Sequence, residues 1–289
     1  MRALITGGNG FIGRHLAVEL DARGHDVMVG DLEAKFWPVG GSCGVLDVCN
    51  PDSLLPAFRQ FKPEVVFHLA AQGDVGQSFA RPVHTIDLNV TATARVWDAC
   101  VRTGVRKIVF PSTWMVYGPP HTWDTFDGRI QKSSPRRPLT PYGISKNAAG
   151  ELLLSLTLWS SGPQAAVLYL GNVYGPGGSN IVQDLLAARR LGQTFRLLES
   201  WRDFVHVTDV VGAMIAAAEF DGSLDVHVAT GVATAVSEVA LMLGAPFEMK
   251  AAEPLDGRVA LDVRAAEQML DWKPQISLEA GLAALTAAR

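Results

Sequence analysis

The feature that most constrains the fold of this 289-residue chain is a glycine-rich segment near its amino terminus, residues 6–13, with the sequence TGGNGFIG. It follows a short aliphatic run and opens an amphipathic run that stops at Gly24. Glycine permits a tight turn from strand to helix and lets the backbone approach a pyrophosphate, which the free amides at a helix start attract. The segment therefore predicts a dinucleotide-binding turn formed by Gly7, Gly10, Phe11, Ile12 and Gly13.

Short aliphatic runs alternate with longer helical patterns over the first two thirds of the chain. The runs predict buried strands at residues 3–5, 27–30, 65–68, 108–110 and 166–169. The helical patterns stop at or before glycine or proline and cover residues 13–23, 51–61, 84–103 and 141–158. Strands that alternate with helices predict an α/β fold with a doubly wound (Rossmann) parallel sheet.

The regular alternation of predicted strands and helices ends after Tyr169. Residues 171–179 hold four glycines and a proline, which predicts a loop or hinge. A further strand is predicted at 202–207 and a helix at 208–220 with Thr208 as its N-cap, followed by helices at 235–243, 262–270 and 278–288. The longest stretch without a predicted element is 118–139. We expect a cofactor-binding domain over 1–171, to which 202–220 returns, and a small substrate-binding lobe over 172–289.

Composition excludes several classes of protein. A net charge of −4 argues against a broad electrostatic grip on nucleic acid or an anionic membrane. No apolar run is long enough for a signal peptide or a membrane span. Three cysteines without a CxxC pair suggest neither a disulfide framework nor a zinc site, and His68 and His206 fit core positions better than metal ligation. A cytoplasmic protein without a bound metal is expected.

Two acidic residues follow predicted strands at the distances that a dinucleotide site needs. Asp31 lies 21 residues beyond Gly10, where a carboxylate accepts hydrogen bonds from the ribose of NAD and repels the extra phosphate of NADP. Asp47 follows a third candidate strand, where it and Val48 can meet the adenine edge. An aspartate at a helix start before Pro51 is an equally good interpretation of Asp47. NAD is the predicted cofactor.

A second motif, Tyr142 and Lys146 in the sequence YGISK, starts a predicted helix after Pro141. Residues four apart lie on one helix face. An ammonium about 4 Å from the phenol is worth about 4 kcal/mol at an effective dielectric near 20, which lowers the pKa of a tyrosine toward the range of a useful base. The end of the strand at 108–110 adds two hydroxyls, Ser112 and Thr113, at the sheet edge where ligands bind.

These motifs occur in a fixed order with four others: HLAAQ at 68–72, DLNVTAT at 87–93, NVYGP at 172–176 and RDFVHVTDV at 202–210. Together with PSTWMVYG at 111–118 they resemble the extended short-chain dehydrogenase/reductases, and most closely their nucleotide-sugar epimerase/dehydratase branch. The resemblance spans nearly the whole chain. It implies a Rossmann fold, NAD and a nucleotide-sugar substrate, and a homodimer built on the helices at 84–103 and 141–158.

The resemblance also implies roles for individual residues. Tyr142 matches the catalytic base, Thr113 the hydroxyl that binds the sugar 4-hydroxyl, and Lys146 the lysine that binds the nicotinamide ribose. Further expected cofactor contacts are Leu69, Ala70, Ala71 and Asn89. Further expected substrate contacts are Gln72, Ser112, Trp114, Asn172, Arg202 and, as a shifted candidate, Arg258. Trp114 fits a pocket wall and a core position equally well.

One departure from the family pattern bears on the reaction. Dehydratases of this branch carry an Asp-Glu pair after the catalytic threonine, and decarboxylases keep the glutamate; this chain has Trp114 and Met115 there. Neither side chain can carry a proton, which favours NAD-dependent 4-epimerisation of a nucleotide-linked hexose, such as a UDP-sugar, through a 4-keto intermediate. A net NAD(P)-dependent ketoreductase or dehydrogenase, or an atypical dehydratase, stays open. A non-catalytic dinucleotide sensor is disfavoured, because both Tyr142 and Lys146 are present.

Overall fold

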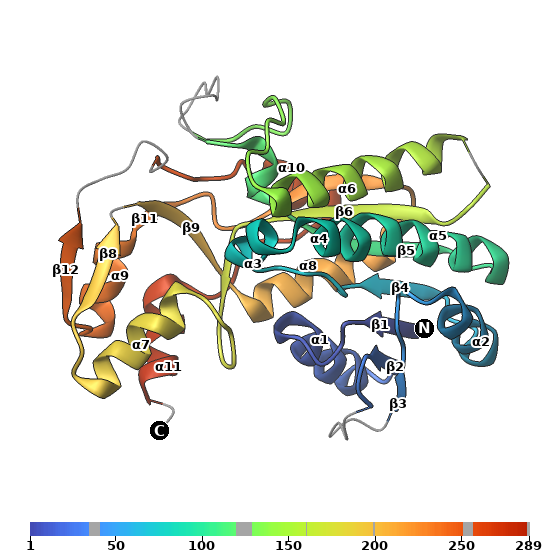
Figure 1. The fold of residues 1–289 in the computed structure, drawn as a ribbon, viewed down its shortest axis with the longest axis horizontal. Coiled ribbons are helices and arrows are strands. Elements are labelled where there is room, and N and C mark those ends of the chain that lie inside the picture. Colours follow the sequence, from blue (N-terminus) through green and yellow to red (C-terminus); the bar gives the residue numbers. More distant parts are fainter. Residues whose placement is uncertain (35–40, 120–128, 160, 199, 251–256, 288–289) are drawn as a thin grey trace. The chain divides into compact units, whose positions relative to one another are not determined.

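The computed structural model describes residues 1–34, 41–119, 129–159, 161–198, 200–250 and 257–287 (Figure 1). The chain divides into two compact units. Unit 1 consists of residues 1–116, 138–169 and 214–226, and unit 2 of residues 117–137, 170–213 and 227–289. None of the described helices is both long and apolar enough to span a membrane.

Unit 1 is built on a seven-stranded sheet with the order β10-β6-β5-β4-β1-β2-β3. Its pairs β1–β2, β2–β3, β1–β4 and β4–β5 are all parallel. The strands are β1 (Arg2–Thr6), β2 (Asp26–Asp31), β3 (Ser42–Val45), β4 (Val65–His68), β5 (Lys107–Thr113), β6 (Gln164–Leu170) and β10 (Leu224–Val228). The predicted doubly wound sheet is confirmed.

The direction in which the strands are added reverses between β1 and β4. The chain runs from β1 outward to β3, then returns to place β4 on the other side of β1, where Thr6 and His68 are partners in the register. Such a reversal opens a crevice at the carboxyl ends of the strands, where open α/β sheets bind ligands. The predicted cofactor motif and the predicted catalytic strand end therefore lie at the same edge of the sheet.

Helices cover the sheet as right-handed crossovers require. They are α1 (Phe11–Ala22), α2 (Pro51–Phe61), α3 (Val75–Ala80), α4 (Pro82–Ile86), α5 (Ala92–Thr103) and α6 (Pro141–Trp159). α2 packs on α5 and α5 on α6, so these helices share one face (Figure 1). α5 ends at Gly104, whose φ of 73° is the left-handed conformation that glycine adopts most easily.

The helix predicted at 84–103 contains an irregular turn. Between α4 and α5 the residues Asp87–Thr91 form a π-helical turn, in which the Ala92 amide bonds to the Asp87 carbonyl five residues back. Single π turns widen a helix and are frequent at functional sites. The sequence pattern did not reveal this turn, because its apolar spacing continues through it.

The segment that returns from unit 2 completes unit 1. Lys107, at the start of β5, is fully buried, and its Nζ donates to the carbonyl of Phe220, at 2.9 Å, and to that of Gly222. The carbonyls of Phe220 and Gly222 follow α8 (Val207–Glu219) and precede β10. Burial lowers the pKa of Lys107 to about 8.

Unit 2 contains two small sheets, with strand orders β11-β9-β7 and β12-β8. The strands are β7 (Asn172–Tyr174), β8 (Phe195–Leu198), β9 (Trp201–His206), β11 (Ala233–Ala235) and β12 (Phe247–Lys250). The helices are α7 (Ile181–Leu191), α9 (Val236–Leu243), α10 (Arg264–Leu270) and α11 (Leu278–Ala287). Leu185, Phe204, Val239 and Leu282 belong to its apolar core.

A buried carboxylate joins three segments of unit 2. Asp203 of β9 accepts from the amide and hydroxyl of Thr230 at 2.7 and 2.6 Å, and from the amides of Gly231 and Leu261 at 2.9 and 3.1 Å. Four donors satisfy a charge that is otherwise costly to bury. Asp203 therefore fixes the chain around 230 and 261 against β9.

Several predictions need correction. β7 lies inside the predicted loop 171–179, because Val173 pairs with Val205 of β9. Thr208 is not an N-cap, since α8 already begins at Val207. Unit 1 ends at 169 and regains 214–226, whereas 202–213 and 117–137 belong to unit 2. Within the predicted unstructured stretch 118–139, residues 120–128 lie outside the described residues, and Ile130 forms a bridge with Leu261.

Candidate active site

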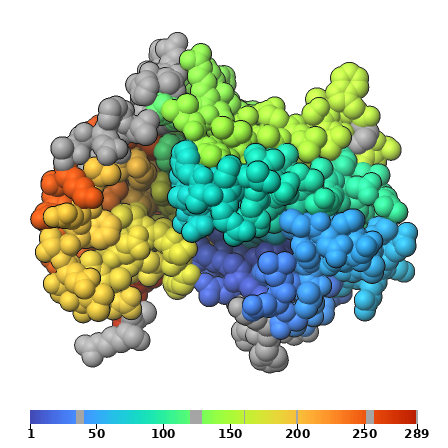
Figure 2. Space-filling view, in the orientation of Figure 1, coloured from blue at the N-terminus to red at the C-terminus, as the bar shows by residue number. Residues whose placement is uncertain are grey.

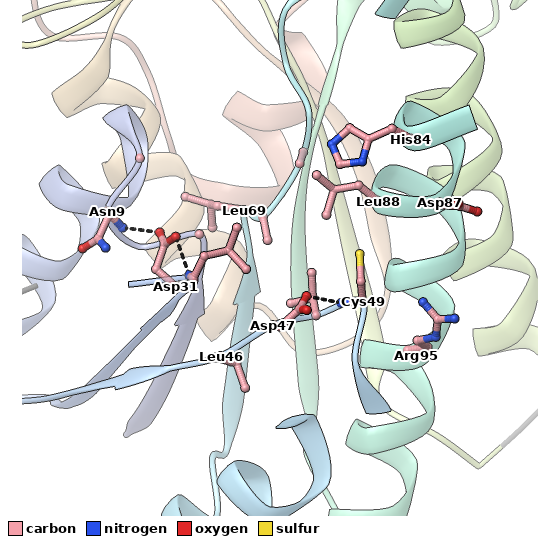
Figure 3. A pocket seen from close by; sticks show the side chains of 16 residues that line it. Asn9, Asp31, Leu46, Asp47, Cys49, Leu69, His84, Asp87, Leu88 and Arg95 are labelled. Carbon is pink, nitrogen blue, oxygen red and sulfur yellow. Dashed lines mark hydrogen bonds between the residues drawn. The ribbon is translucent and has the colours of Figure 1, made fainter. Parts of the chain in front are cut away.

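A groove of about 870 Å³ lies at the reversal of the sheet in unit 1 (Figure 3). It is bounded by the glycine-rich turn, by the segments that follow β2, β3 and β4, and by the π turn and α5. Its lining residues are Gly7, Asn9, Gly10, Asp31, Leu32, Leu46, Asp47, Val48, Cys49, Leu69, Ala70, Ala71, His84, Asp87, Leu88 and Arg95. Ligand clefts of proteins commonly have this size.

The glycine-rich turn fits a dinucleotide because it has no room for side chains. Gly7 has a φ of 68°, and a Cβ there would lie 2.6 Å from the amide nitrogen of Ala70. A Cβ on Gly13 would lie 2.7 Å from the Gly7 carbonyl oxygen. The backbone amide at the start of α1, after the N-cap Gly10, is thereby left open to a ligand phosphate.

Asp31 lines the groove with its carboxylate held in place. Oδ2 accepts from the Asn9 amide and Oδ1 from the Leu32 amide, both at 2.8 Å. The Asn9 side chain also donates to the Glu33 carbonyl at 2.8 Å, which ties the turn after β2 to the glycine-rich turn. Asp31 keeps further lone pairs for ribose hydroxyls, as the sequence predicted.

Asp31→Ser is expected to reduce the preference for NAD over NADP by at least about tenfold. The carboxylate repels a 2′-phosphate, and about 1.4 kcal/mol corresponds to a factor of ten. Calorimetric titration of both cofactors measures the ratio of dissociation constants. Asp47→Asn is the matched control, because it removes a charge from the same groove and should leave that ratio unchanged within about threefold. An unchanged ratio in Asp31→Ser would contradict the role of Asp31.

Asp47 lies at the other end of the groove, beside Cys49 (Figure 3). Its Oδ1 accepts from the Cys49 amide at 2.8 Å, and its own amide donates to Ser53 at 3.0 Å. The cap of α2 is Asn50, whose side chain accepts from the Asp52 amide. Asp47 therefore faces the groove rather than capping the helix, which favours the adenine interpretation.

Half of the residues that line the groove were not predicted from the sequence. Asn9, Leu32, Leu46, Cys49, His84, Asp87, Leu88 and Arg95 border the groove without having been predicted. Asn9 alone carried a signal, since it lies within the glycine motif. Among the predicted cofactor residues, Phe11, Ile12 and Gly13 begin α1 and Asn89 is buried, so none of the four lines the groove.

The three predicted catalytic residues come together at the end of β5 and the start of α6. The hydroxyl of Thr113 forms a hydrogen bond with the phenol of Tyr142. Lys146, 3% exposed, lies one helical turn further, with its Nζ 3.9 Å from the centre of the Phe110 ring. Strand β5 thus contributes the hydroxyl and the aromatic platform, and α6 contributes the phenol and the amine.

The electrostatics of the catalytic trio differ from the expectation. Burial raises the pKa of Tyr142 to about 12, which the hydrogen bond from Thr113 opposes. Burial lowers the pKa of Lys146 to about 7. The expected lowering of the tyrosine pKa by an ammonium is therefore not seen in the protein alone, because burial disfavours the charged form of both groups.

Ser112 has an unmet hydrogen bond. It is 3% exposed, and its Oγ has no hydrogen-bond partner within the described part of the chain. A buried hydroxyl without a partner costs about 1–3 kcal/mol, which a ligand can recover. Ser112 lies beside Thr113, and the next residues, Trp114 and Met115, are half-buried and carry no ionisable group.

Asn89 and Gln72 do not line the groove; hydrogen bonds join them to each other and join Asn89 to α6, the helix that carries Tyr142 and Lys146. The amide of Gln72 donates to Asn89 Oδ1 at 2.8 Å, and Asn89 Nδ2 donates to the Gln72 carbonyl at 2.9 Å and to Ser145 Oγ at 2.8 Å. Gln72 itself borders a smaller cavity of about 250 Å³ with Asp74, Gln77, Arg81 and His84.

The remaining predicted substrate residues lie in unit 2, where they are neighbours. Asn172 pairs with Phe204 in β9, which also carries Arg202. Arg258 forms a bridge with Trp201, and its guanidinium lies 5.2 Å from the Trp201 ring. The three residues thus lie on or beside β9, and their amide and guanidinium groups are of the kind that donate to phosphates. No cluster of metal-ligating side chains occurs among the residues that the structure describes.

Comparison with known proteins places these features in a family context. Residues 3–229 match the profile of the NAD dependent epimerase/dehydratase family. The chain is 34% identical to a UDP-glucose 4-epimerase of Mycolicibacterium smegmatis, over 98% of this chain and 96% of the relative. It is 30% identical to a dTDP-L-rhamnose 4-epimerase of Burkholderia thailandensis, over 98% and 93%. The solved structure of MoeE5 in complex with UDP-glucose and NAD superposes with a TM-score of 0.87 at 32% identity, over 98% and 96%.

Proposed function

Because this chain belongs to the NAD dependent epimerase/dehydratase family, we propose that it interconverts the C4 epimers of a UDP-linked hexose. One observation carries the reaction type: Thr113, Tyr142 and Lys146 are assembled beside a dinucleotide groove, while Trp114 and Met115 supply no acid or base for a second reaction. The enzyme class and NAD follow from the family and from the relatives. The carbon atom, the sugar and the nucleotide are the proposal.

The chain's own groups perform the proton transfers at carbon 4. Thr113 holds the sugar 4-hydroxyl, and the Tyr142 phenolate accepts its proton. NAD, when bound in the groove, would supply the hydride acceptor and donor for carbon 4. The sugar then turns so that its other face is presented, and Tyr142 returns the proton to the oxygen. Holding the reacting groups in place contributes much of the rate.

The ionisation of Tyr142 needs partners that the protein alone does not provide. With a pKa of about 12 the phenol is protonated at neutral pH. A charged Lys146 and the positive nicotinamide both favour the phenolate, and the phenolate in turn favours the ammonium form of Lys146. We infer that Tyr142 becomes an effective base only after NAD is bound, so the site does not remove protons when no cofactor is present.

The nucleotide is inferred from the relatives and from unit 2. The relatives act on UDP- and dTDP-sugars by name, and MoeE5 was solved with UDP-glucose. Asn172, Arg202 and Arg258 provide donors for the diphosphate. We therefore propose UDP-glucose and UDP-galactose as the first substrates to test.

An isotope label at carbon 4 of the sugar tests the proposed epimerisation. With UDP-glucose deuterated at carbon 4, the product is expected to have the substrate's mass and to differ only in configuration, with deuterium still on carbon 4. Mass spectrometry and NMR measure both. With UDP-glucose, loss of water shows an atypical dehydratase and stoichiometric use of the cofactor shows a reductase. A UDP-linked uronic acid is assayed in parallel, because UDP-glucose has no carboxylate, and loss of carbon dioxide from it shows a decarboxylase. Each of these results overturns epimerisation. A parallel panel of dTDP-, GDP- and CDP-sugars tests the nucleotide.

We further propose that the protein forms a homodimer through the two predicted helical segments, 84–103 and 141–158, with α3 beside them. α6 packs against both α3 and α4, and Phe79, Val83, Ile86 and Ile144 on these helices are 39–73% exposed. Figure 2 shows the surface that these helices form, in teal and green. A cluster of large apolar side chains at the surface favours association. Analytical ultracentrifugation should give twice the chain mass, and Val83→Glu should lower it.

The cellular compartment is inferred from the thiols. Cys43, Cys49 and Cys100 are all free, and Cys43 is exposed. An exposed thiol persists in a reducing compartment, which supports the cytoplasm.

A further inference from the structure

A chain of buried hydrogen bonds runs through unit 1 from the end of β1 to the π turn. Thr6 Oγ1 lies 2.7 Å from His68 Nδ1, and His68 Nε2 lies 3.0 Å from Thr93 Oγ1. The Thr93 hydroxyl donates to the Asn89 carbonyl at 2.7 Å. Thr6, His68 and Thr93 are all fully buried.

The direction of every bond in this chain is determined. Because the Thr93 hydroxyl gives its proton to the Asn89 carbonyl, it can only accept from His68, so Nε2 carries the imidazole proton. Nδ1 is then an acceptor, and the Thr6 hydroxyl donates a hydrogen bond to it. Thr6 Oγ1 in turn accepts from the amide of Ala70 at 3.3 Å. A neutral imidazole in one tautomer satisfies all of these groups.

The surroundings keep the imidazole neutral. Burial and the nearby Lys146 lower the pKa of His68 to about 3. The ring packs 5.9 Å from the ring of Phe110, over which Lys146 is placed. A neutral imidazole adds no repulsion to the Lys146 ammonium that the phenolate requires.

The chain of hydrogen bonds continues from the π turn to α6. Asn89 Nδ2 donates to Ser145 Oγ, and Ser145 Oγ donates to the Tyr142 carbonyl at 2.8 Å. Asn89, which makes these contacts, lies inside the π turn. The position of Asn89 therefore sets where the first turn of α6 lies.

We infer that His68 is a positioning residue: through Thr93 it fixes the π turn at Asn89, and through Asn89 and Ser145 it fixes the first turn of α6, which carries Tyr142 and Lys146. His68 does not line the groove, and the sequence pattern predicts only a core position for it. It couples the strand ends that bind the cofactor to the helix that carries the base. The effect on turnover rests on the proposed function, whereas the effect on α6 does not.

The experiment uses two matched pairs of variants in the full chain. His68→Leu removes both bonds, whereas His68→Gln keeps one acceptor and one donor. Thr93→Val removes the hydroxyl with little change of shape, whereas Thr93→Ser keeps it. The second pair stays informative if His68→Leu does not fold.

Two readouts separate positioning from general stability. Hydrogen exchange followed by mass spectrometry is expected to be at least about threefold faster in a peptide covering 142–150 in the Leu and Val variants, with peptides of α1 changed less. With UDP-glucose, kcat is expected to fall about 10- to 100-fold in these two variants while KM changes less than about threefold. His68→Gln and Thr93→Ser should recover both readouts to within about threefold of the wild type.

The inference is overturned if Leu and Gln at position 68 behave alike, or if exchange rises equally in all peptides, since either result indicates packing alone. If the wild-type protein turns over no UDP-sugar, the proposed substrate fails, and the exchange data still decide the role of His68. Exchange that is faster in α6 with kcat unchanged would show that α6 tolerates the shift and would overturn the positioning role.

Discussion

Replacing Tyr142 by phenylalanine is expected to lower kcat by about 100- to 10,000-fold, the usual worth of a general acid–base group. The proposed mechanism assigns the proton transfers with the sugar to this phenol, and Thr113 already binds it. Binding of NAD should change less than about threefold, because the groove is lined by other residues. Steady-state assays with UDP-glucose measure kcat, and isothermal titration calorimetry with NAD measures cofactor binding.

Tyr169→Phe is the matched control for Tyr142→Phe. It removes a phenol hydroxyl from a buried tyrosine of unit 1 that lies on β6, and it should leave kcat within about threefold of the wild type. A Tyr142→Phe variant that kept a tenth of the wild-type activity would show that another group is the base. Loss of NAD binding in that variant would show that the phenol holds the cofactor instead.

Lys146→Met is expected to inactivate the enzyme and at the same time to stabilise the cofactor-free protein. Burial lowers the pKa of this lysine from 10.5 to about 7 in the folded state. Because the pKa of Lys146 is lower in the folded state than in the unfolded state, the free energy of unfolding is highest above pH 10.5, where the lysine is neutral in both states. It decreases as the pH falls toward 7, because the unfolded state then binds a proton that the folded state disfavours. Charging this lysine in the unfolded chain therefore lowers the free energy of unfolding at neutral pH by roughly 4–5 kcal/mol, and methionine removes that cost.

Urea unfolding of wild type and Lys146→Met at two pH values tests the linkage. The methionine variant should be more stable by a margin that is largest at pH 7 and that shrinks toward pH 10. All other titrating groups cancel in this difference. A margin that does not depend on pH would show that packing, and not the buried charge, separates the two proteins. Activity should be lost at both values.

The sheet of unit 1 could be predicted from the sequence because each of its first strands is a short aliphatic run that ends at a turn or a helix start. β4 was predicted with the bounds that the structure shows, and α2 likewise, since Pro51 starts it and Pro63 follows its end. The strands β7 and β11 have three residues each, and a run that short carries no periodicity. β8 and β12 pair only with each other, so nothing local marks them.

The candidate site was predictable wherever a motif fixes a backbone position. Thr113 and Tyr142 meet because a strand end and a helix start converge at the same sheet edge, and each motif marks one of them. His84, Leu88 and Arg95 escaped prediction because a helix that passes the groove presents side chains that no motif identifies. The high pKa of Tyr142 escaped as well, because spacing along a helix does not reveal how much water is excluded.

The return of residues 214–226 to unit 1 has a consequence for the order in which the protein is made. The ribosome releases β1 to β6 and then the whole segment that forms β7 to β9 and α8 before β10 can take its place at the sheet edge. Until then the Lys107 ammonium has no carbonyls of Phe220 and Gly222 to bond, although it belongs in the core. The nascent sheet therefore exposes an unpaired edge at β6 over some fifty residues of synthesis, the interval in which a chaperone is of most use to it.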